Sequence, residues 1–160
     1  SCQNLSDYCG GGFKGIQDNL DYIQGMGFDA IWISPVVKNA PPCYHGYCAL
    51  DYYQINEHFG GQSDLFDLIA EMHKRNMWLM LDVVANHSIP MNTDIREAGQ
   101  VNPFNKKEYY HNYCVINWND RTSMEDCWLG FLADLNQDVE FVETGLLEWI
   151  SYMVTTYNVD

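Results

Sequence analysis

The sequence has 160 residues, 47% of them hydrophobic and 19% charged, which is ordinary for one globular domain with its own core. Only 8 Lys and Arg face 22 Asp and Glu, and the formal net charge of −14 disfavours nucleic acid while suiting a neutral substrate or a cation such as Ca²⁺. No apolar run reaches the roughly 20 residues that cross a bilayer, so no membrane association is expected. The first residues have no basic or apolar lead, so no signal peptide is expected within this sequence, and the alternative is one that has been cleaved.

The first predicted elements are a helix and a strand. Three glycines at 10–12 lead into a segment that carries Ile16, Leu20 and Ile23 on one helical face. Two further glycines end that helix. The run 30–35 (AIWISP) is apolar without alternation, which predicts a short strand buried on both faces of a parallel sheet.

A second helix and strand follow a loop rich in proline and aromatic residues. Ser63 is expected to cap the helix, whose buried face is predicted to contain Leu65, Leu68, Ile69 and Met72. The run 78–85 (WLMLDVVA) predicts the next buried strand. Residues from about 88 to 137 show no periodicity, so an irregular excursion is expected there. A final helix is predicted from the apolar face formed by Val142, Leu146, Trp149, Ile150 and Met153.

Helices and strands that alternate with short connections predict a parallel α/β sheet. A doubly wound sheet and a (β/α)₈ barrel have the same pattern at this level. The barrel needs about 250 residues, and this chain holds too few strands to close one. The chain is therefore either a small open sheet or a segment of a larger domain.

The six cysteines fall into sequence-local pairs: Cys2 with Cys9, Cys43 with Cys48, and Cys114 with Cys127. Six cysteines allow about 15 connectivities, so these disulfides are predicted from proximity alone. None of the cysteines has the CxxC spacing of a zinc site. Disulfides indicate an oxidising, extracellular compartment, whereas six reduced cysteines would instead fit a cytosolic protein.

The segment 82–87 (DVVANH) carries the most information about function. An apolar strand runs into Asn86 and His87, and in parallel α/β folds the carboxyl end of a strand carries the chemistry. The Asn86 amide oxygen suits Ca²⁺, and His87 offers a hydrogen bond to a sugar hydroxyl or to an acid. A lone histidine after a strand is also often a structural residue, so the segment alone does not distinguish a functional from a structural role for His87.

Together with its flanking motifs, this segment resembles the α-amylase family of glycoside hydrolases, and the fungal-type enzymes most closely. The family carries D-V-V-x-N-H at the end of its third barrel strand, which this chain matches from Asp82 to His87. Further matches extend over nearly the whole chain: 25–28 with 31–36 (first helix and second strand), 45–47 (the substrate loop), and 125–130 with 133–135 (a small calcium-binding domain inserted after strand three).

The resemblance implies that the chain is part of a (β/α)₈ TIM barrel, from about helix 1 to helix 3, with an irregular calcium-binding insertion after strand 3. Residues 1–87 are then the N-terminal part of the barrel, 88–137 the inserted small domain, and 138–160 barrel helix 3. The first barrel strand is expected before the chain, and the fourth, whose Gly-x-Arg-x-Asp motif holds the nucleophile, just past Asp160. The catalytic carboxylates are therefore expected beyond Asp160, and none is assigned within the chain.

The resemblance also assigns substrate-binding residues. Tyr47 resembles the aromatic residue that stacks on the sugar at the cleavage subsite, and His87 resembles the histidine that bonds a hydroxyl of that sugar. Tyr44 and His45 are expected to flank the pocket. Asp82 is expected to support the pocket by hydrogen bonding, although a structural acid beside an arginine of the missing strand is the stronger interpretation.

This chain departs from the fungal pattern at the loop before His45, which is shorter. Cys48 stands where the fungal enzymes have tryptophan, and Cys43 precedes Tyr44. A Cys43–Cys48 bridge would brace Tyr44 and Tyr47 but would remove an aromatic side chain from the cleft.

The resemblance implies a Ca²⁺ site formed by Asn86, Glu125 and Asp134, with a further carbonyl ligand past Asp160. Taken without the resemblance, Glu125 and Asp134 are better interpreted as solvated loop acids. Asn86 also begins a glycosylation sequon, as does Asn4, but one amide cannot both carry a glycan and bind calcium. The buried strand before Asn86 favours the ligand role, with its side-chain oxygen directed toward Asp134 and a carboxylate or carbonyl of Glu125.

The implied function is that of a secreted, calcium-dependent α-amylase that cleaves internal α-1,4 bonds of starch- or glycogen-type glucans with retention of configuration. The expected partners are the α-glucan and the remainder of the catalytic domain. The alternatives are an α-glucosidase or glucan transferase of the same family, or a non-catalytic member that acts as a binding module. The isolated chain is expected to be inactive and poorly folded, because a barrel segment leaves strand edges unpaired.

Overall fold

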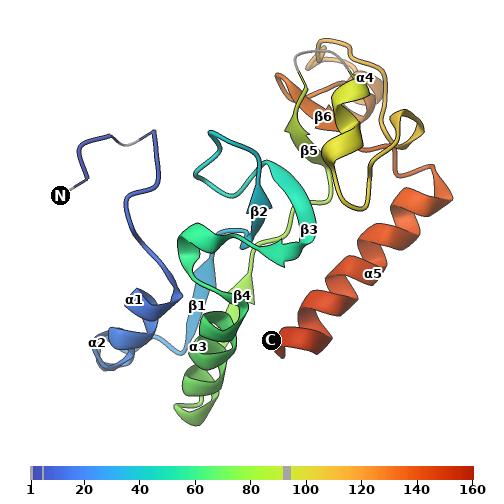
Figure 1. The fold of residues 1–160 in the computed structure, drawn as a ribbon. Helices are drawn as coiled ribbons and strands as arrows, with labels where there is room; N and C mark the ends of the chain where they lie inside the picture. Colours follow the sequence, from blue (N-terminus) through green and yellow to red (C-terminus); the bar gives the residue numbers. More distant parts are fainter. Residues whose placement is uncertain (1, 5, 92–94) are drawn as a thin grey trace.

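The computed structural model describes residues 2–4, 6–91 and 95–160, without the side chains of 95–97. The first half of the chain contains two short helices, three strands, a 3-10 turn and a longer helix: α1 (Phe13–Asp18), α2 (Leu20–Gly25), β1 (Ala30–Ile33), β2 (Val37–Asn39), β3 (Ala49–Ile55), η1 (Glu57–Phe59) and α3 (Gln62–Lys74). The second half contains β4 (Trp78–Leu81), β5 (His87–Pro90), η2 (Ile95–Gln100), η3 (Lys107–Tyr109), α4 (Arg121–Asp126), β6 (Leu132–Asp134) and α5 (Glu140–Tyr157). Figure 1 shows their arrangement.

The centre of the fold is a parallel pair of strands. β1 pairs with β4 in the register Ala30 to Trp78 through Ile33 to Leu81. The connection between them contains the antiparallel hairpin of β2 and β3 and then α3, so the unit is a parallel β-α-β crossover with a hairpin added. The predicted parallel α/β arrangement is confirmed for these two strands.

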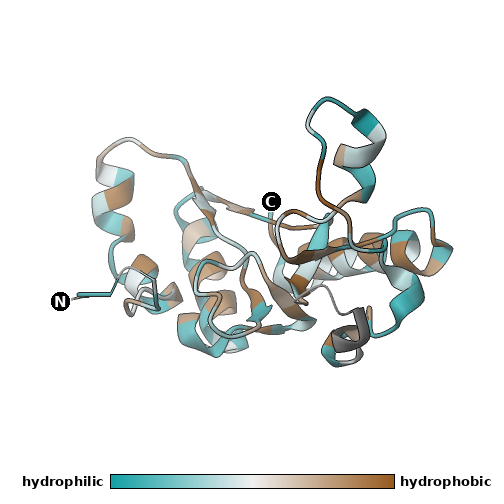
Figure 2. Cartoon of the chain, turned by 90° about the horizontal axis from the view of Figure 1, so that it is seen from above, coloured by the Kyte–Doolittle hydropathy of each residue, from teal (hydrophilic) through white to brown (hydrophobic). Residues whose placement is uncertain are grey.

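The two faces of this strand pair differ in exposure. Leu79 points to the helix side and is fully buried with Leu68 and Met72 of α3. On the opposite face Trp32 is 70% exposed and Met80 is 60% exposed. The prediction that both strands are buried on both faces is therefore wrong for this chain, because the described helices cover only one face. Figure 2 shows apolar and polar segments interspersed along the helices and strands.

Helix boundaries differ from the sequence-based expectation at two places. The single helix predicted after the glycines is broken at Asn19, whose side-chain nitrogen donates to the carbonyl of Gly15 at 2.7 Å. Asparagine side chains compete with backbone hydrogen bonds in this way and interrupt helices. The second helix begins at Gln62 and not after Ser63, because the Asp64 carboxylate accepts from the Gly61 N–H at 2.7 Å and closes the first turn.

The irregular stretch predicted after the second long strand contains a small antiparallel pair. β5 pairs with β6, with His87 opposite Asp134 and Pro90 opposite Leu132. The pair lies together with α4 at one end of the molecule, away from β1 and β4 (Figure 1). α5 then runs from the end that holds β5 and β6 back toward the C-terminus (Figure 1). Its predicted apolar face is mostly buried, and Trp149 packs edge-on to Tyr52 with 4.8 Å between the ring centroids.

All six cysteines are joined in the three predicted local pairs. Their Cα atoms lie 5.2 Å apart in Cys2–Cys9, 6.0 Å in Cys43–Cys48 and 4.9 Å in Cys114–Cys127. These separations lie in the range of protein disulfides. Within the described residues, no helix combines the length and the apolar character needed to cross a membrane.

Candidate functional site

The substrate loop predicted from sequence is the tight turn between β2 and β3. The Cys43–Cys48 disulfide closes it, and it carries Tyr44, His45 and Tyr47. Gly46 has a φ of +94°, and a Cβ atom there would lie 2.8 Å from the carbonyl oxygen of Pro35. Only glycine therefore fits this turn against the segment that follows β1.

Three of the predicted site residues meet beside the carboxyl end of β4. The Tyr47 hydroxyl donates to Oδ2 of Asp82 at 2.9 Å, and Nε2 of His87 lies 3.1 Å from the Tyr47 carbonyl oxygen. The hydrogen bond to Asp82, aided by burial, raises the pKa of the Tyr47 hydroxyl. The hydroxyl therefore stays protonated and holds Asp82 as its acceptor.

His87 is buried, with 7% of its surface exposed. Its Nδ1 lies 3.3 Å from the side-chain nitrogen of Asn86, so both ring nitrogens have protein partners. Burial lowers the pKa of His87, and the hydrogen bond to the Tyr47 carbonyl opposes that shift only in part. The neutral tautomer with the proton on Nε2 satisfies both contacts, because Nε2–H donates to Tyr47 and Nδ1 accepts from Asn86.

Tyr44 and His45 lie at the surface of the same turn. The His45 ring stacks on Tyr47 with centroids 5.8 Å apart, and Tyr44 meets His45 edge-on at 5.4 Å. Tyr44 is 36% exposed and Tyr47 is 38% exposed. The turn therefore presents three adjacent aromatic side chains that are partly exposed, a surface of the kind that packs on sugar rings.

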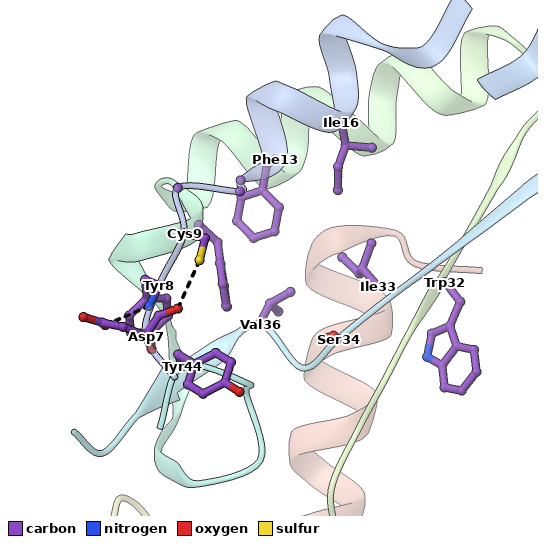
Figure 3. Close-up of a pocket in the computed structure, with 14 residues that line it drawn as sticks. Asp7, Tyr8, Cys9, Phe13, Ile16, Trp32, Ile33, Ser34, Val36 and Tyr44 are labelled. Atoms are coloured by element: carbon purple, nitrogen blue, oxygen red, sulfur yellow. Dashed lines mark hydrogen bonds between the residues drawn. The ribbon is translucent and has the colours of Figure 1, made fainter. Parts of the chain in front are cut away.

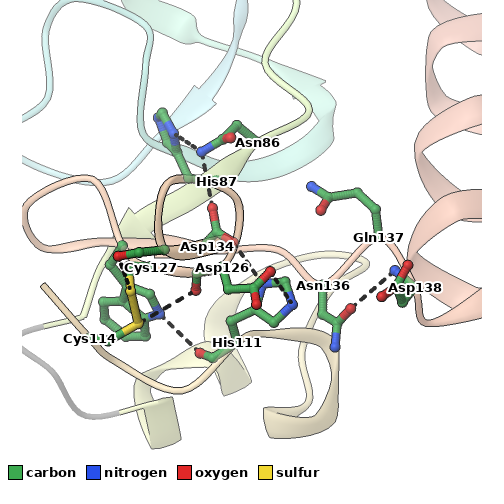
Figure 4. Close-up of polar contacts among 12 residues, drawn as sticks. Asn86, His87, His111, Cys114, Asp126, Cys127, Asp134, Asn136, Gln137 and Asp138 are labelled. Carbon is green, nitrogen blue, oxygen red and sulfur yellow. Dashed lines mark hydrogen bonds and ion pairs between the residues drawn. A yellow bond between two sulfur atoms is a disulfide. The ribbon is translucent and has the colours of Figure 1, made fainter. Parts of the chain in front are cut away.

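A second polar group surrounds Asp134 at the join between β4 and the β5–β6 pair. The Asn86 side-chain nitrogen donates to Oδ1 of Asp134 at 3.1 Å, and Nδ1 of His111 lies 2.8 Å from Oδ2 (Figure 4). Nε2 of His111 lies 3.8 Å from a carboxylate oxygen of Asp126. Burial raises the pKa of the Asp134 carboxyl, and the contacts with His111 and Asn86 offset this only in part.

The structure brings together Asn86 and Asp134 as predicted, but not the Glu125 carboxylate. That carboxylate is half-exposed and accepts from Nε of Arg121 at 2.7 Å on the outer face of α4. The expected orientation of Asn86 is also wrong, because its nitrogen and not its oxygen faces Asp134. Sequence analysis missed His111 and Asp126, since an isolated histidine in an irregular loop gives no periodic or motif signal.

Two residues here can offer oxygen donors to a hard cation, Asp134 through its carboxylate and Asn86 through its amide, whereas His111 offers only nitrogen. Ca²⁺ prefers carboxylate, amide and carbonyl oxygens, and a buried carboxylate whose pKa is raised by desolvation gains from a neighbouring positive charge. The Asn86 side-chain nitrogen donates to Asp134, so as a calcium ligand Asn86 would have to turn its amide to present the oxygen.

Cys43, His45 and Cys48 also place three potential ligand atoms within 4.8 Å of one another. Both sulfur atoms are bonded to each other, so neither is available as a thiolate. Sulfur and imidazole are moreover soft ligands that do not suit Ca²⁺. This group is therefore distinct from the candidate calcium site.

The chain belongs to the alpha-amylase family: residues 3–160 match the family described as the alpha-amylase catalytic domain. Among curated proteins it is similar to alpha-amylase 1 of Schizosaccharomyces pombe, with 48% identity over 169 residues. Among solved structures it is similar to an alpha-amylase from Malbranchea cinnamomea, with a TM-score of 0.95 and 43% identity over 100% of this chain. An alpha-amylase from Geobacillus thermoleovorans, solved with acarbose, gives a TM-score of 0.90 and 39% identity, also over 100% of this chain.

These matches cover only part of each relative. The 160 residues cover 27% of the S. pombe protein, 36% of the Malbranchea chain and 35% of the Geobacillus chain. In the alignment with the S. pombe protein, 97% of the 160-residue chain is matched. The chain is thus a fragment of an alpha-amylase catalytic domain.

Proposed function

We propose that the intact protein containing this chain is an α-amylase that hydrolyses internal α-1,4 bonds of starch- or glycogen-type glucans with retention of configuration. The observation that carries this proposal is the contact of Tyr47 with Asp82 and His87 at the carboxyl end of β4. In a member of this family, that is the end of the strands where the chemistry is expected.

In this proposal Tyr47 stacks on the sugar ring at the cleavage subsite, and Tyr44 and His45 extend the aromatic surface around it. Sugar C–H faces are apolar, so an aromatic ring fixes their orientation without a charged contact. Asp82 holds the Tyr47 hydroxyl and so orients the ring. Nε2 of His87 donates to the Tyr47 carbonyl, so His87 holds the turn, and a direct hydrogen bond from Nε2 to a sugar hydroxyl would have to replace this contact.

The catalytic carboxylates are proposed to lie beyond Asp160. A retaining glycosidase needs two carboxyl groups about 5 Å apart, one as nucleophile and one as acid and base. The remainder of the catalytic domain is proposed to pack on the exposed face of β1 and β4 and to complete a (β/α)₈ barrel. The proposed division of the chain follows, with 1–87 and 138–160 in the barrel and 88–137 in the insertion.

Calcium is proposed to bind between the barrel and the insertion. Asn86 and Asp134 would hold it from the two sides, and of the two Glu125 groups expected from sequence, the carbonyl would be the ligand, since the carboxylate pairs with Arg121. The ion supplies positive charge beside a buried carboxylate and so joins the two parts of the molecule. Asn86 is proposed to be unglycosylated, because the side chain that would carry the glycan is the proposed calcium ligand beside the buried Asp134 carboxylate. The three disulfides favour a secreted protein.

The test uses the intact protein with a soluble starch and a linear maltooligosaccharide. We expect internal cleavage, with products released first as the α-anomer, and KM raised at least about tenfold by Tyr47→Ala. Tyr22→Ala is the matched control, since Tyr22 is an exposed tyrosine on α2. Release of single glucose units or of transfer products instead identifies an α-glucosidase or glucan transferase. Binding without any cleavage identifies a non-catalytic family member.

A further inference from the structure

The three aromatic residues proposed to bind sugar lie in one ring of six residues, closed by the Cys43–Cys48 disulfide. Inside this ring the Tyr47 N–H donates to Nδ1 of His45 at 3.1 Å. Outside it, the Tyr47 hydroxyl reaches Asp82. These contacts hold the middle of the turn, and further contacts hold its two ends.

One end of the ring is held by a residue far away in sequence. The Tyr8 hydroxyl donates to the carbonyl oxygen of Cys43 at 3.0 Å and accepts from the side-chain nitrogen of Asn56 at 2.8 Å. The Tyr8 ring stacks on His58 with centroids 3.8 Å apart and planes 4° from parallel. Asn56 is 3% exposed, so the anchor is fixed in the body of the protein. Tyr8 and Tyr44 line one cavity of about 560 Å³ (Figure 3).

The other end of the ring is held from β2. The Cys48 N–H donates to Oδ1 of Asn39 at 2.7 Å, and the Asn39 side-chain nitrogen donates to the Val37 carbonyl at 2.8 Å. Cys48 is 1% exposed and leads directly into β3. Hydrogen bonds thus tie both ends of the ring to the body of the protein, partly buried at Cys43 and buried at Cys48, and the disulfide joins the two ends to each other.

We propose that the Cys43–Cys48 disulfide and the Tyr8 hydroxyl are positioning devices that order the Tyr44–Tyr47 turn before the glucan binds. This inference rests on the proposed function. A loop that becomes ordered only when the ligand binds loses conformational entropy, and this weakens binding. A cross-link that orders the loop in the free protein removes this loss from the binding step. Neither group touches the sugar in this scheme, so their effect is on binding and not on the chemical step.

The test compares variants of the intact protein on a linear maltooligosaccharide. Cys43→Ala with Cys48→Ala is expected to raise KM about tenfold while kcat changes less than about twofold, as expected when binding is lost uniformly. Tyr8→Phe keeps the stack on His58 but loses the hydroxyl, and is expected to raise KM about threefold. Cys114→Ala with Cys127→Ala is the matched control, which is expected to lower Tm and leave KM unchanged.

Hydrogen exchange of the Tyr47 and Cys48 amides without substrate gives an independent measurement. We expect exchange at least about tenfold faster in both turn variants than in the wild type. Unchanged KM and unchanged exchange in folded variants would overturn the proposal. If the double cysteine variant does not fold, KM and amide exchange of Tyr8→Phe test the proposal instead. A wild-type protein that does not hydrolyse α-glucans refutes the proposed function instead, and amide exchange still decides whether the brace orders the turn.

Discussion

The Asp160 carboxylate accepts a hydrogen bond from the Leu79 N–H at 3.0 Å, and the Asp160 N–H donates to the Leu79 carbonyl at 3.3 Å. Residue 160 therefore lies alongside the free edge of β4, opposite the edge that pairs with β1. The same carboxylate oxygen lies 2.9 Å from Nε2 of His73 near the end of α3. One side chain thus links α3, β4 and the segment that follows α5.

We predict that Asp160→Asn destabilises the intact protein by about 1 kcal/mol near neutral pH, the usual value of a charge-assisted hydrogen bond at a partly exposed site. Burial alone would raise the pKa of Asp160, but the hydrogen bonds from His73 and Leu79 outweigh it and lower the pKa. A carboxyl with a lowered folded-state pKa contributes stability above its unfolded pKa and loses it as the pH falls further.

Denaturant unfolding of wild type and variant at two pH values checks this prediction. The difference between them should be present near neutral pH, should shrink as the pH falls from about 4 toward the lowered folded-state pKa, and should be gone once the carboxyl is protonated in both states. Asp18→Asn, which breaks an exposed pair with Lys14 on α1, is the control and should change stability by only a few tenths of a kcal/mol or less. A difference that persists in acid would show that charge is not the cause.

The calcium proposal predicts different outcomes for two acidic residues. Asp134→Ala should abolish calcium retention and lower Tm, because its buried carboxylate is the central ligand. Glu125→Ala should retain the ion, because the Glu125 side chain faces Arg121 in solvent. Asn86→Ala should weaken retention and Tm together.

Metal content after dialysis and Tm with and without a chelator measure both effects. The chelator should lower the Tm of the wild type and of Glu125→Ala but leave that of Asp134→Ala unchanged, since binding to the folded state alone adds stability. An Asn86→Ala protein that keeps its calcium and its Tm would show that the amide is not a ligand.

His87 makes stability depend on pH in the weakly acidic range. Burial lowers its pKa from 6.5, so the folded state resists protonation more than the unfolded chain does. Its neutral form therefore contributes fully above about pH 6.5, and stability is lost as the pH falls toward the lowered folded-state value. His87→Gln removes this titration.

The measurement is unfolding free energy against pH for both proteins at constant calcium. The wild type should lose stability relative to the variant as the pH falls from about 6.5 to 5. A constant difference across this window would mean that His87 is accessible enough to be protonated without cost.

The sequence predicted the parallel strands, α5 and the disulfides because each rests on a local signal. Apolar runs without alternation marked β1 and β4, and short spacing paired the cysteines. It did not predict that the face bearing Trp32 and Met80 is exposed, because burial depends on what covers a strand and not on the strand itself. The roles of Tyr8 and His111 also escaped it, since they depend on contacts between segments that no local pattern connects.

We expect the 160-residue chain alone to be unable to hydrolyse starch and to show no cooperative thermal transition. Trp32, Trp78 and Met80 are each at least 60% exposed on one face of the β1–β4 pair. Contiguous apolar surface of this kind marks an interface, and open strand edges promote association. The chain should therefore bind a hydrophobic dye strongly and self-associate. Release of reducing sugar from a pure sample would refute the inactivity, and a sharp calorimetric transition of a monomer would refute the need for the remainder of the domain.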